Sequence, residues 1–354
     1  MNLTLTFDYE LFGDGSGDVF EQMIKPTDQI LNLCEKHHIK TTIFFEVAEY
    51  LKIKKEWESG NDMGYALNPV KAIDEQIKKA LQSGHDIQLH IHPQWVHAEF
   101  TDNRWHVDFS NWRMGDFKSE KGLSLEELVI SGKETLEGLL KEVDDSYSCI
   151  GFRAGAFNIM PSEKITEALK KAGIKYDSSV YPGGYEEGEL SRYDYREVPV
   201  TKDYWRADPL DIRRESGRTD TIIEIPIFSL PKSRIYKLLN AEKIRSLILK
   251  KNDGISSVAR TKIAEKNVMQ KIAYLFQKEA MTWDFCLFSK QLHKQFFSEI
   301  ENNLLDKRNT FVLIGHPKSL LSLKSLETLI NLAKKSRYDY TFKTMKEIYG
   351  EFNT

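Results

Sequence analysis

Cysteine is scarce in this chain of 354 residues: there are three, Cys34, Cys149 and Cys286, and they lie far apart. An odd number of widely spaced cysteines argues against a disulfide framework and fits buried thiols in a reducing compartment. Long apolar runs are also missing, since none approaches the roughly 18–20 residues that a membrane span needs. No basic segment followed by an apolar stretch marks a signal peptide after Met1. We therefore expect a cytoplasmic protein.

A large excess of either charge is absent as well. The chain has 50 Lys and Arg against 53 Asp and Glu, so its formal net charge is −3. This balance indicates no nucleic-acid partner, and we expect none. The hydrophobic fraction of 41% and the charged fraction of 29% are ordinary for a soluble globular protein. The length permits one barrel-sized domain or two ordinary ones.

Strand-like and helix-like segments alternate along the chain. β-branched and aromatic runs predict strands at 3–7, 41–45, 86–92, 148–152, 221–227, 310–314 and 340–342. Apolar spacing and caps, such as the capping box of Ser124 and Glu127, predict helices at 26–36, 70–83, 123–140, 162–172 and 325–335. This alternation predicts an α/β fold with a parallel sheet or barrel.

Polar side chains stand at or just after the ends of four predicted strands: Asp8, His90, Arg153 and His316. In parallel barrels the active site lies at the carboxyl ends of the strands. Four separate segments that place polar chemistry at the same kind of position favour a shared site at that edge.

Two fragments at these strand ends combine carboxylates and imidazoles. Residues 6–10 read Thr-Phe-Asp-Tyr-Glu, and residues 85–93 read His-Asp-Ile-Gln-Leu-His-Ile-His-Pro. Residues i and i+2 of a strand face the same way, so Asp8 and Glu10 can reach one site, as can His90 and His92. Oxygen and nitrogen ligands suit a catalytic divalent metal, with a spare carboxylate to handle a proton. The pattern predicts metal-assisted hydrolysis.

Four motifs together resemble a known family. They resemble, in the same order, the motifs of the polysaccharide deacetylases, the NodB-homology group of carbohydrate esterases. The four motifs are Thr-Phe-Asp at 6–8, Gly-His-Asp-Ile-Gln-Leu-His at 84–90, Phe-Arg-Ala-Gly at 152–155 and Leu-Ile-Gly-His-Pro at 313–317. The resemblance runs from residue 1 to about 230 and resumes near 305. It is nearest to members of surface-polysaccharide and O-antigen biosynthesis clusters. It implies a distorted (β/α)7-type barrel, one divalent metal, usually zinc, and removal of acetyl from an N-acetyl sugar.

The resemblance also implies catalytic roles. Asp8 matches the general base, and Arg153 matches the arginine that pairs with it. His316 matches the general acid that protonates the leaving amine, and its pKa class suits proton transfer near neutral pH. Asp177 matches the family's fourth motif, in which an aspartate orients the catalytic imidazole; it could equally cap a turn.

The expected metal ligands are Glu10, His90 and His92, with two departures from the family's pattern. Tyr9 separates the two carboxylates, which the family usually has adjacent. The usual second histidine lies four residues after the first, but this position is Gln94. His92 is the nearest substitute, and Gln94 and His97 remain alternatives.

Two stretches interrupt the alternation. Residues 94–122 read as a long loop rich in Trp, and its aromatics favour a wall for a sugar ring. Residues 232–308 read as a helical insertion within a single barrel domain spanning 1–354. Between Pro231 and Ala280, twelve Lys and Arg stand against four Asp and Glu, a balance of +8. This basic segment is either a solvated helical face or a surface for anionic membrane, lipid-diphosphate or nucleotide-sugar groups.

The resulting hypothesis is a metal-dependent de-N-acetylase in bacterial surface-polysaccharide or lipopolysaccharide biosynthesis, acting on an N-acetylated sugar or lipid-linked glycan. Two alternatives remain open. One is a small-molecule amidohydrolase or amino-sugar deformylase on the same fold. The other is a non-catalytic glycan-binding member, which the missing histidine favours. Asp8, Arg153 and His316 together favour catalysis, because a binding protein needs no base, base partner and acid.

Overall fold

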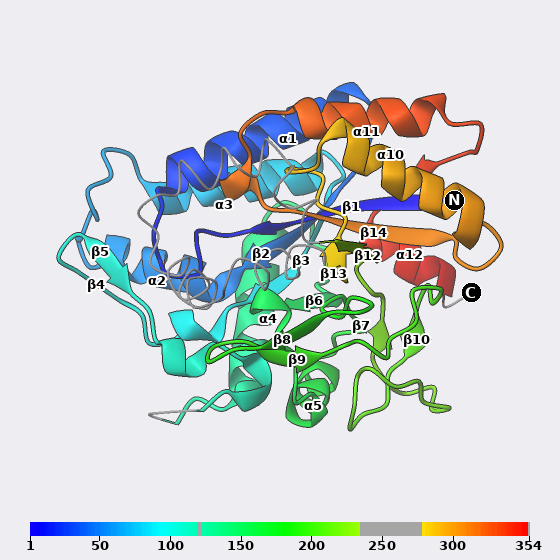
Figure 1. Cartoon of the computed structure of the whole chain (residues 1–354). Coiled ribbons are helices and arrows are strands. Elements are labelled where there is room, and N and C mark those ends of the chain that lie inside the picture. Colours follow the sequence, from blue (N-terminus) through cyan, green and yellow to red (C-terminus); the bar gives the residue numbers. More distant parts are fainter. Residues whose placement is uncertain (119–121, 234–277, 353–354) are drawn as a thin grey trace, which may run out of the picture.

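A curled, mostly parallel sheet forms the centre of the computed structural model, which describes residues 1–118, 122–233 and 278–352 (Figure 1). The strand order is β10-β11-β7-β6-β3-β2-β1-β14, and β15 pairs with the first residues of β1. The strands are β1 (Asn2–Tyr9), β2 (Thr42–Glu46), β3 (Asp86–Ile91), β6 (Gly151–Ala154), β7 (Tyr176–Asp177), β10 (Trp205–Arg206), β11 (Ile223–Glu224), β14 (Thr310–Gly315) and β15 (Thr341–Phe342).

The two edges of the sheet approach each other through the chain that follows β11. Ile227 forms a parallel bridge with Val312 of β14, and the backbone N–H of Phe228 donates to the carbonyl of Val312 at 2.8 Å. Asp284 forms a second parallel bridge, with Ile314. The sheet therefore curls into an open barrel, and the predicted α/β fold is confirmed.

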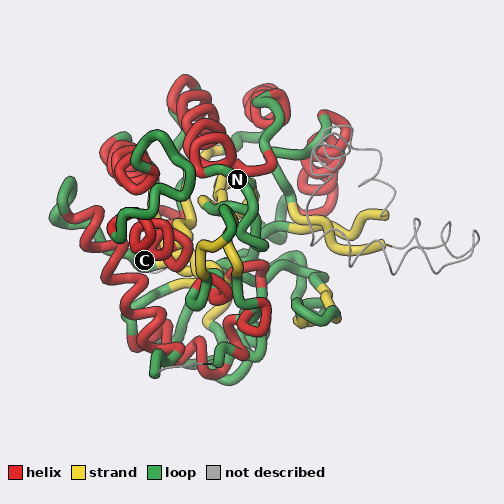
Figure 2. The backbone as a smooth tube through the Cα atoms, turned by 90° about the vertical axis from the view of Figure 1, so that its left-hand side faces the viewer, coloured by secondary structure: helices red, strands yellow, loops and turns green. Residues whose placement is uncertain are grey.

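Helices cover the outside of the curled sheet, and the strands lie between them (Figure 2). They are α1 (Lys25–Lys36), α2 (Val47–Glu58), α3 (Pro69–Gln82), α4 (Leu125–Lys141), α5 (Glu163–Lys171), α10 (Lys290–Glu299), α11 (Lys324–Lys335) and α12 (Met345–Phe352). The capping box of Ser124 and Glu127 starts α4 as predicted. The helices α2 and α12 were not predicted; α2 follows β2 without a loop, which hides its start.

Alternate residues of each strand face different cores. Leu3, Leu5 and Phe7 of β1 belong to the large cluster that the helices cover. Residues on the inner face join a smaller cluster that includes Phe44, Val312 and Ile348 of α12. On β1 the alternate positions are Thr4, Thr6 and Asp8, all buried. The two-residue period of the strand therefore directs Thr4, Thr6 and Asp8 to the inside of the barrel, with Asp8 nearest to the carboxyl end of β1.

Two pairs of short strands, β4 (Glu99–Thr101) with β5 (Arg104–His106) and β8 (Tyr185–Glu187) with β9 (Arg192–Asp194), extend from this body. The loop 94–122 is largely structured. Trp95 and Trp105 are buried, with ring centroids 5.2 Å apart. These two tryptophans stabilise the loop from within, so the predicted sugar wall is wrong for them.

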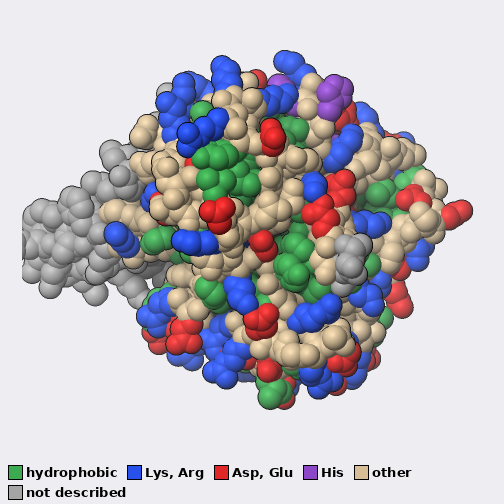
Figure 3. Space-filling model, turned by 90° about the vertical axis from the view of Figure 1, so that its right-hand side faces the viewer, with side chains coloured by type: hydrophobic (Ala, Val, Ile, Leu, Met, Phe, Trp, Pro, Cys, Tyr) green, Lys and Arg blue, Asp and Glu red, His purple; other side chains and the backbone are tan. Residues whose placement is uncertain are grey.

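The expected insertion at 232–308 is not wholly helical where it is described. Residues Ser229–Ser233 (β12) and Lys278–Thr282 (β13) form an antiparallel pair, and α10 follows. Most of the basic segment, 234–277, lies outside the described residues. The face in Figure 3 intersperses Lys and Arg with Asp and Glu. Among the described helices, none is long and apolar enough to cross a membrane.

The three cysteines are buried and unpaired, as expected. Burial raises the pKa of both Cys34 and Cys149 to about 12. These thiols are therefore protonated at neutral pH and unreactive as nucleophiles.

Candidate metal centre and active site

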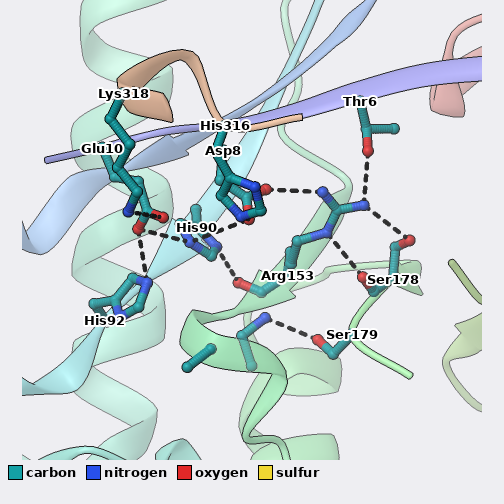
Figure 4. A network of polar contacts seen from close by, with 12 residues as sticks. Thr6, Asp8, Glu10, His90, His92, Arg153, Ser178, Ser179, His316 and Lys318 are labelled. Atoms are coloured by element: carbon teal, nitrogen blue, oxygen red, sulfur yellow. Dashed lines mark hydrogen bonds and ion pairs between the residues drawn. The ribbon is translucent and has the colours of Figure 1, made fainter. Parts of the chain in front are cut away.

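The carboxyl ends of β1, β2, β3, β6 and β14 meet at one end of the barrel and bring their polar side chains together (Figure 4). The strand register places His90 beside Glu46 on one side and beside Arg153 on the other. All three are buried, as is Asp8. The predicted shared edge therefore exists, and its parts come from segments up to about 300 residues apart in the chain.

Asp8 and Arg153 form a buried ion pair, with Nη1 2.8 Å from Oδ1. The guanidinium also donates to the hydroxyl of Thr6 at 2.9 Å and to the carbonyl of Ser178 at 2.9 Å, and it lies 4.0 Å over the ring of Phe44. Burial would raise the pKa of Asp8, but Arg153 and neighbouring imidazoles outweigh it, so the pKa lies below its usual value. Asp8 is thus held ionised and in a fixed orientation.

Glu10 is held between a lysine and two histidines. Its Oε1 accepts a hydrogen bond from Nζ of Lys318 at 2.7 Å. Its Oε2 lies 2.7 Å from Nε2 of His92 and 3.4 Å from Nε2 of His90. Burial opposes ionisation of Glu10, but Lys318 and His92 lower its pKa well below the usual range. The carboxylate is therefore charged, with Oε2 directed at the imidazoles.

The backbone carbonyl of Arg153 orients the ring of His90. Its Nδ1 lies 2.8 Å from the backbone carbonyl of Arg153, which fixes the proton on Nδ1 and leaves Nε2 directed at Glu10 and Asp8. Burial lowers the pKa of His90, but Asp8 and Glu10 outweigh this effect and raise it to about 9. With Nδ1 held in this way, the ring turns Nε2 toward the carboxylates of the site.

The donor atoms at this site fit a divalent cation. One ligand atom from each of Glu10, Glu46, His90 and His92 lies within 4.8 Å of the others, and all four residues are buried. Among the described residues, Oε2 of Glu46 has no hydrogen-bond partner, while Oε2 of Glu10 and Nε2 of His90 contact only other ionisable groups of the site. Buried polar atoms without partners are costly unless something binds them. Two imidazoles with carboxylates suit zinc, nickel, cobalt or iron.

The structure places the three alternatives for the second ligand differently. His92 lies against Glu10, whereas Gln94 is buried behind it, with Nε2 2.9 Å from Nδ1 of His92. His97 belongs to neither candidate metal group among the described residues. Strand β3 ends at Ile91, and His92, directly after it, keeps the face of His90. Residues Pro93–Trp95 form a short 3-10 turn, which takes Gln94 off the strand and behind His92.

His316 lies at the opening of the site, with its side chain 24% exposed. Its Nε2 is 3.7 Å from Oδ2 of Asp8, and its Nδ1 is 3.7 Å from Oδ2 of Asp284. Asp284 therefore faces the ring of His316, where Asp177 was expected. The carboxylate of Asp177 instead accepts hydrogen bonds from the backbone N–H and the hydroxyl of Ser179, so that expectation needs correction.

Three residues at the site escaped the sequence reasoning. Glu46 ends a strand in the same way as His90, so the strand-end rule would have found it. Asp284 lies in the stretch interpreted as an insertion, where no strand was expected. Lys318 follows His316 by two residues, and nothing in the sequence alone links it to Glu10.

A comparison with solved structures finds similar chains at low sequence identity. An assigned polysaccharide deacetylase from Mycobacterium smegmatis is 12% identical, with a TM-score of 0.50 over 99% of this chain and 90% of that one. PuuE allantoinase (12%, TM-score 0.49) and an assigned polysaccharide deacetylase from Pseudomonas aeruginosa PAO1 (13%, TM-score 0.47) each match over 99% of this chain and 90% of theirs. These last two scores are too low to bear on the fold.

No protein-family model and no curated protein matches the chain. The comparisons therefore establish that this α/β barrel is shared with a protein assigned as a polysaccharide deacetylase.

Proposed function

We propose that this protein is a metal-dependent hydrolase that removes the acetyl group from an N-acetyl sugar. One observation carries the proposal. A buried cluster of ligand atoms from Glu10, His90 and His92 adjoins an ionised carboxylate, Asp8, that Arg153 holds in place. A binding surface for glycans needs neither the paired aspartate nor the unpartnered donor atoms.

Glu10, His90 and His92 would hold the metal. When bound, a divalent ion supplies Lewis-acid polarisation of an amide carbonyl and lowers the pKa of a water. The protein's contribution is to aim Nε2 of His90 and Oε2 of Glu10 at one point, through the carbonyl of Arg153 and the ammonium of Lys318.

Asp8 serves as the general base. It accepts the proton of the water that attacks the acetamide carbon, and the new carbon–oxygen bond forms as that proton leaves. Its lowered pKa means that it is ionised at neutral pH and ready to accept. Arg153 is a positioning residue: its fixed guanidinium prevents the carboxylate from turning away.

His316 serves as the general acid for the leaving nitrogen. It is the partly exposed member of the site, so a sugar approaching from solvent meets it first. Asp284 faces Nδ1, and Nε2 is directed toward Asp8 and the reacting group. When the carbon–nitrogen bond breaks, the proton passes to the amine, and acetate and a free amino sugar result.

The proposed setting is the cytoplasmic side of bacterial surface-polysaccharide or lipopolysaccharide assembly, with an N-acetyl sugar or lipid-linked glycan as substrate. The excess of twelve basic over four acidic residues between Pro231 and Ala280 supports peripheral contact with an anionic membrane. Neutralising Lys243, Lys250 and Lys251 should weaken binding to anionic vesicles. Absence of such binding by the parent protein would contradict this part of the proposal.

Acetate release from a panel of free, nucleotide-linked and lipid-linked N-acetyl sugars tests the activity. The metal-loaded parent should release acetate, and Asp8→Asn should reduce the rate by about 10²–10⁴-fold while it retains the metal. His316→Gln should also lose rate, whereas His106→Gln, on the exposed strand β5, is a matched control and should not. A metal-loaded protein that releases no acetate from any member of the panel would contradict the proposal.

A further inference from the structure

Glu46 is a buried carboxylate in which one oxygen accepts hydrogen bonds and the other has no hydrogen-bond partner among the described residues. It is the last residue of β2 and is 2% exposed. Its Oε1 accepts hydrogen bonds from the backbone N–H of Ala48 at 3.0 Å and of Glu49 at 3.3 Å, which caps the start of α2. Its Oε2 has no hydrogen-bond partner in the described part of the chain. Leaving such an oxygen unpaired costs stability, so a ligand is expected for it.

Helix capping accounts for only one of the two carboxylate oxygens of Glu46. A helix N-cap needs one acceptor oxygen, and Ser, Thr, Asp and Asn are the preferred residues for that role. A shorter side chain would cap α2 without bringing a second carboxylate oxygen into the site. The extra reach of glutamate therefore points to a use for Oε2.

Glu46 belongs to the same group of residues as the expected metal ligands. The parallel register sets Glu46 directly beside His90, and one ligand atom of Glu46 lies within 4.8 Å of those of Glu10, His90 and His92. Figure 4 shows the last three directed toward one another from β1 and β3.

The four residues also share one construction. In each residue the protein holds one polar atom in place, and the other polar atom has no such partner from the backbone or from a residue outside the site. Oε1 of Glu10 binds Lys318, Nδ1 of His90 meets the carbonyl of Arg153, Nδ1 of His92 meets Gln94, and Oε1 of Glu46 meets the backbone of α2. Partners of this kind orient metal ligands in proteins.

We propose that Glu46 is a fourth protein ligand of the metal, beside Glu10, His90 and His92. The inference rests on the metal dependence of the proposed function. Catalytic zinc sites generally use three protein ligands and an open position. Two carboxylates and two imidazoles form a more oxygen-rich set, which favours ions that accept more than four ligands, such as Mn²⁺, Fe²⁺ or Co²⁺.

Cobalt titration of the parent protein, Glu46→Gln and Glu49→Gln tests the proposal. Glu49 is an equally buried carboxylate, but both of its oxygens face the backbone N–H of Leu11, at 3.1 and 3.0 Å. It controls for the replacement of a nearby buried carboxyl group by an amide. Glu46→Gln should weaken Co²⁺ binding by at least about tenfold and change the visible spectrum of the bound ion, because a ligand is lost. Glu49→Gln should leave the spectrum unchanged.

An unchanged affinity and spectrum in folded Glu46→Gln would overturn the proposal, and so would equal losses in the two variants. A crystal structure of the metal-loaded parent tests it without any substitution. Oε2 of Glu46 should lie about 2.0–2.2 Å from the ion, and a separation beyond about 3 Å would overturn the assignment. A parent that binds metal and releases acetate while Glu46→Gln behaves normally refutes this inference alone. A parent that binds no metal refutes the metal dependence of the proposed function as well.

Discussion

Replacing Arg153 with methionine should leave Asp8 buried without its cation. The guanidinium donates hydrogen bonds to Asp8 at 2.8 Å, to Thr6 at 2.9 Å, and to the carbonyl and hydroxyl of Ser178 at 2.9 and 3.3 Å. Removing one partner of a buried pair costs about 3–5 kcal/mol. The three neutral acceptors that also lose their donor place the expected loss of unfolding free energy in the upper half of that range.

The pH dependence of this loss follows from burial. In the parent protein Arg153 keeps the pKa of Asp8 below its usual value despite burial. In Arg153→Met, burial raises the folded-state pKa of Asp8 above the unfolded value of about 3.9. A carboxyl with a raised pKa loses its stability contribution as the pH rises through the folded value. The deficit relative to the parent should therefore be larger at pH 8 than at pH 4.

Denaturant unfolding with EDTA present measures this effect without stabilisation by bound metal. The parent, Arg153→Met, Asp8→Asn and the double variant form a cycle. The double variant should be more stable than Arg153→Met alone, since it no longer buries an unpaired charge. If the two single losses simply add to within about 0.5 kcal/mol, or if Arg153→Met costs less than about 1 kcal/mol, the buried pair does not hold the base as described.

Two further predictions concern the surroundings of the site. Burial, with a contribution from Asp177, raises the pKa of Glu224 well above its usual range, so this carboxyl contributes stability below its unfolded pKa of about 4.3 and loses it as the pH rises. Glu224→Gln should therefore match the parent in urea unfolding at pH 4 and exceed it at pH 8; equal stabilities at both would refute the assignment. A Cβ on Gly155 would lie 2.5 Å from Nδ1 of His92, so Gly155→Ala should displace the ring and weaken metal binding in a titration. Gly138→Ala, where a Cβ meets nothing within 4 Å, is the control, and an equal effect in both would refute the displacement.

The shared edge of the sheet could be predicted because it depends on local rules. Alternation of strand and helix indicated parallel strands, and the two-residue period paired Asp8 with Glu10 and His90 with His92. In the structure these pairs do face one site. The same rule applied to the end of the neighbouring strand would have brought Glu46 into the candidate site.

Other parts of the site depend on long-range contacts that no local pattern contains. Asp177 and Asp284 both follow strand-like residues, and only the bridge between Asp284 and Ile314 brings the latter to His316. Trp95 and Trp105 resemble a sugar platform in sequence but pack against each other. Trp112, whose ring centroid is 6.2 Å from that of His92, is the tryptophan of this loop that contacts the site.

Metal content of the purified protein, measured beside His90→Ala and His92→Ala, tests the central claim most directly. We predict one equivalent of a divalent metal in the parent and its loss from both variants, with far-UV circular dichroism unchanged. Absence of metal under every loading condition, or full occupancy in either variant, would contradict a metal centre at the carboxyl ends of β1 and β3.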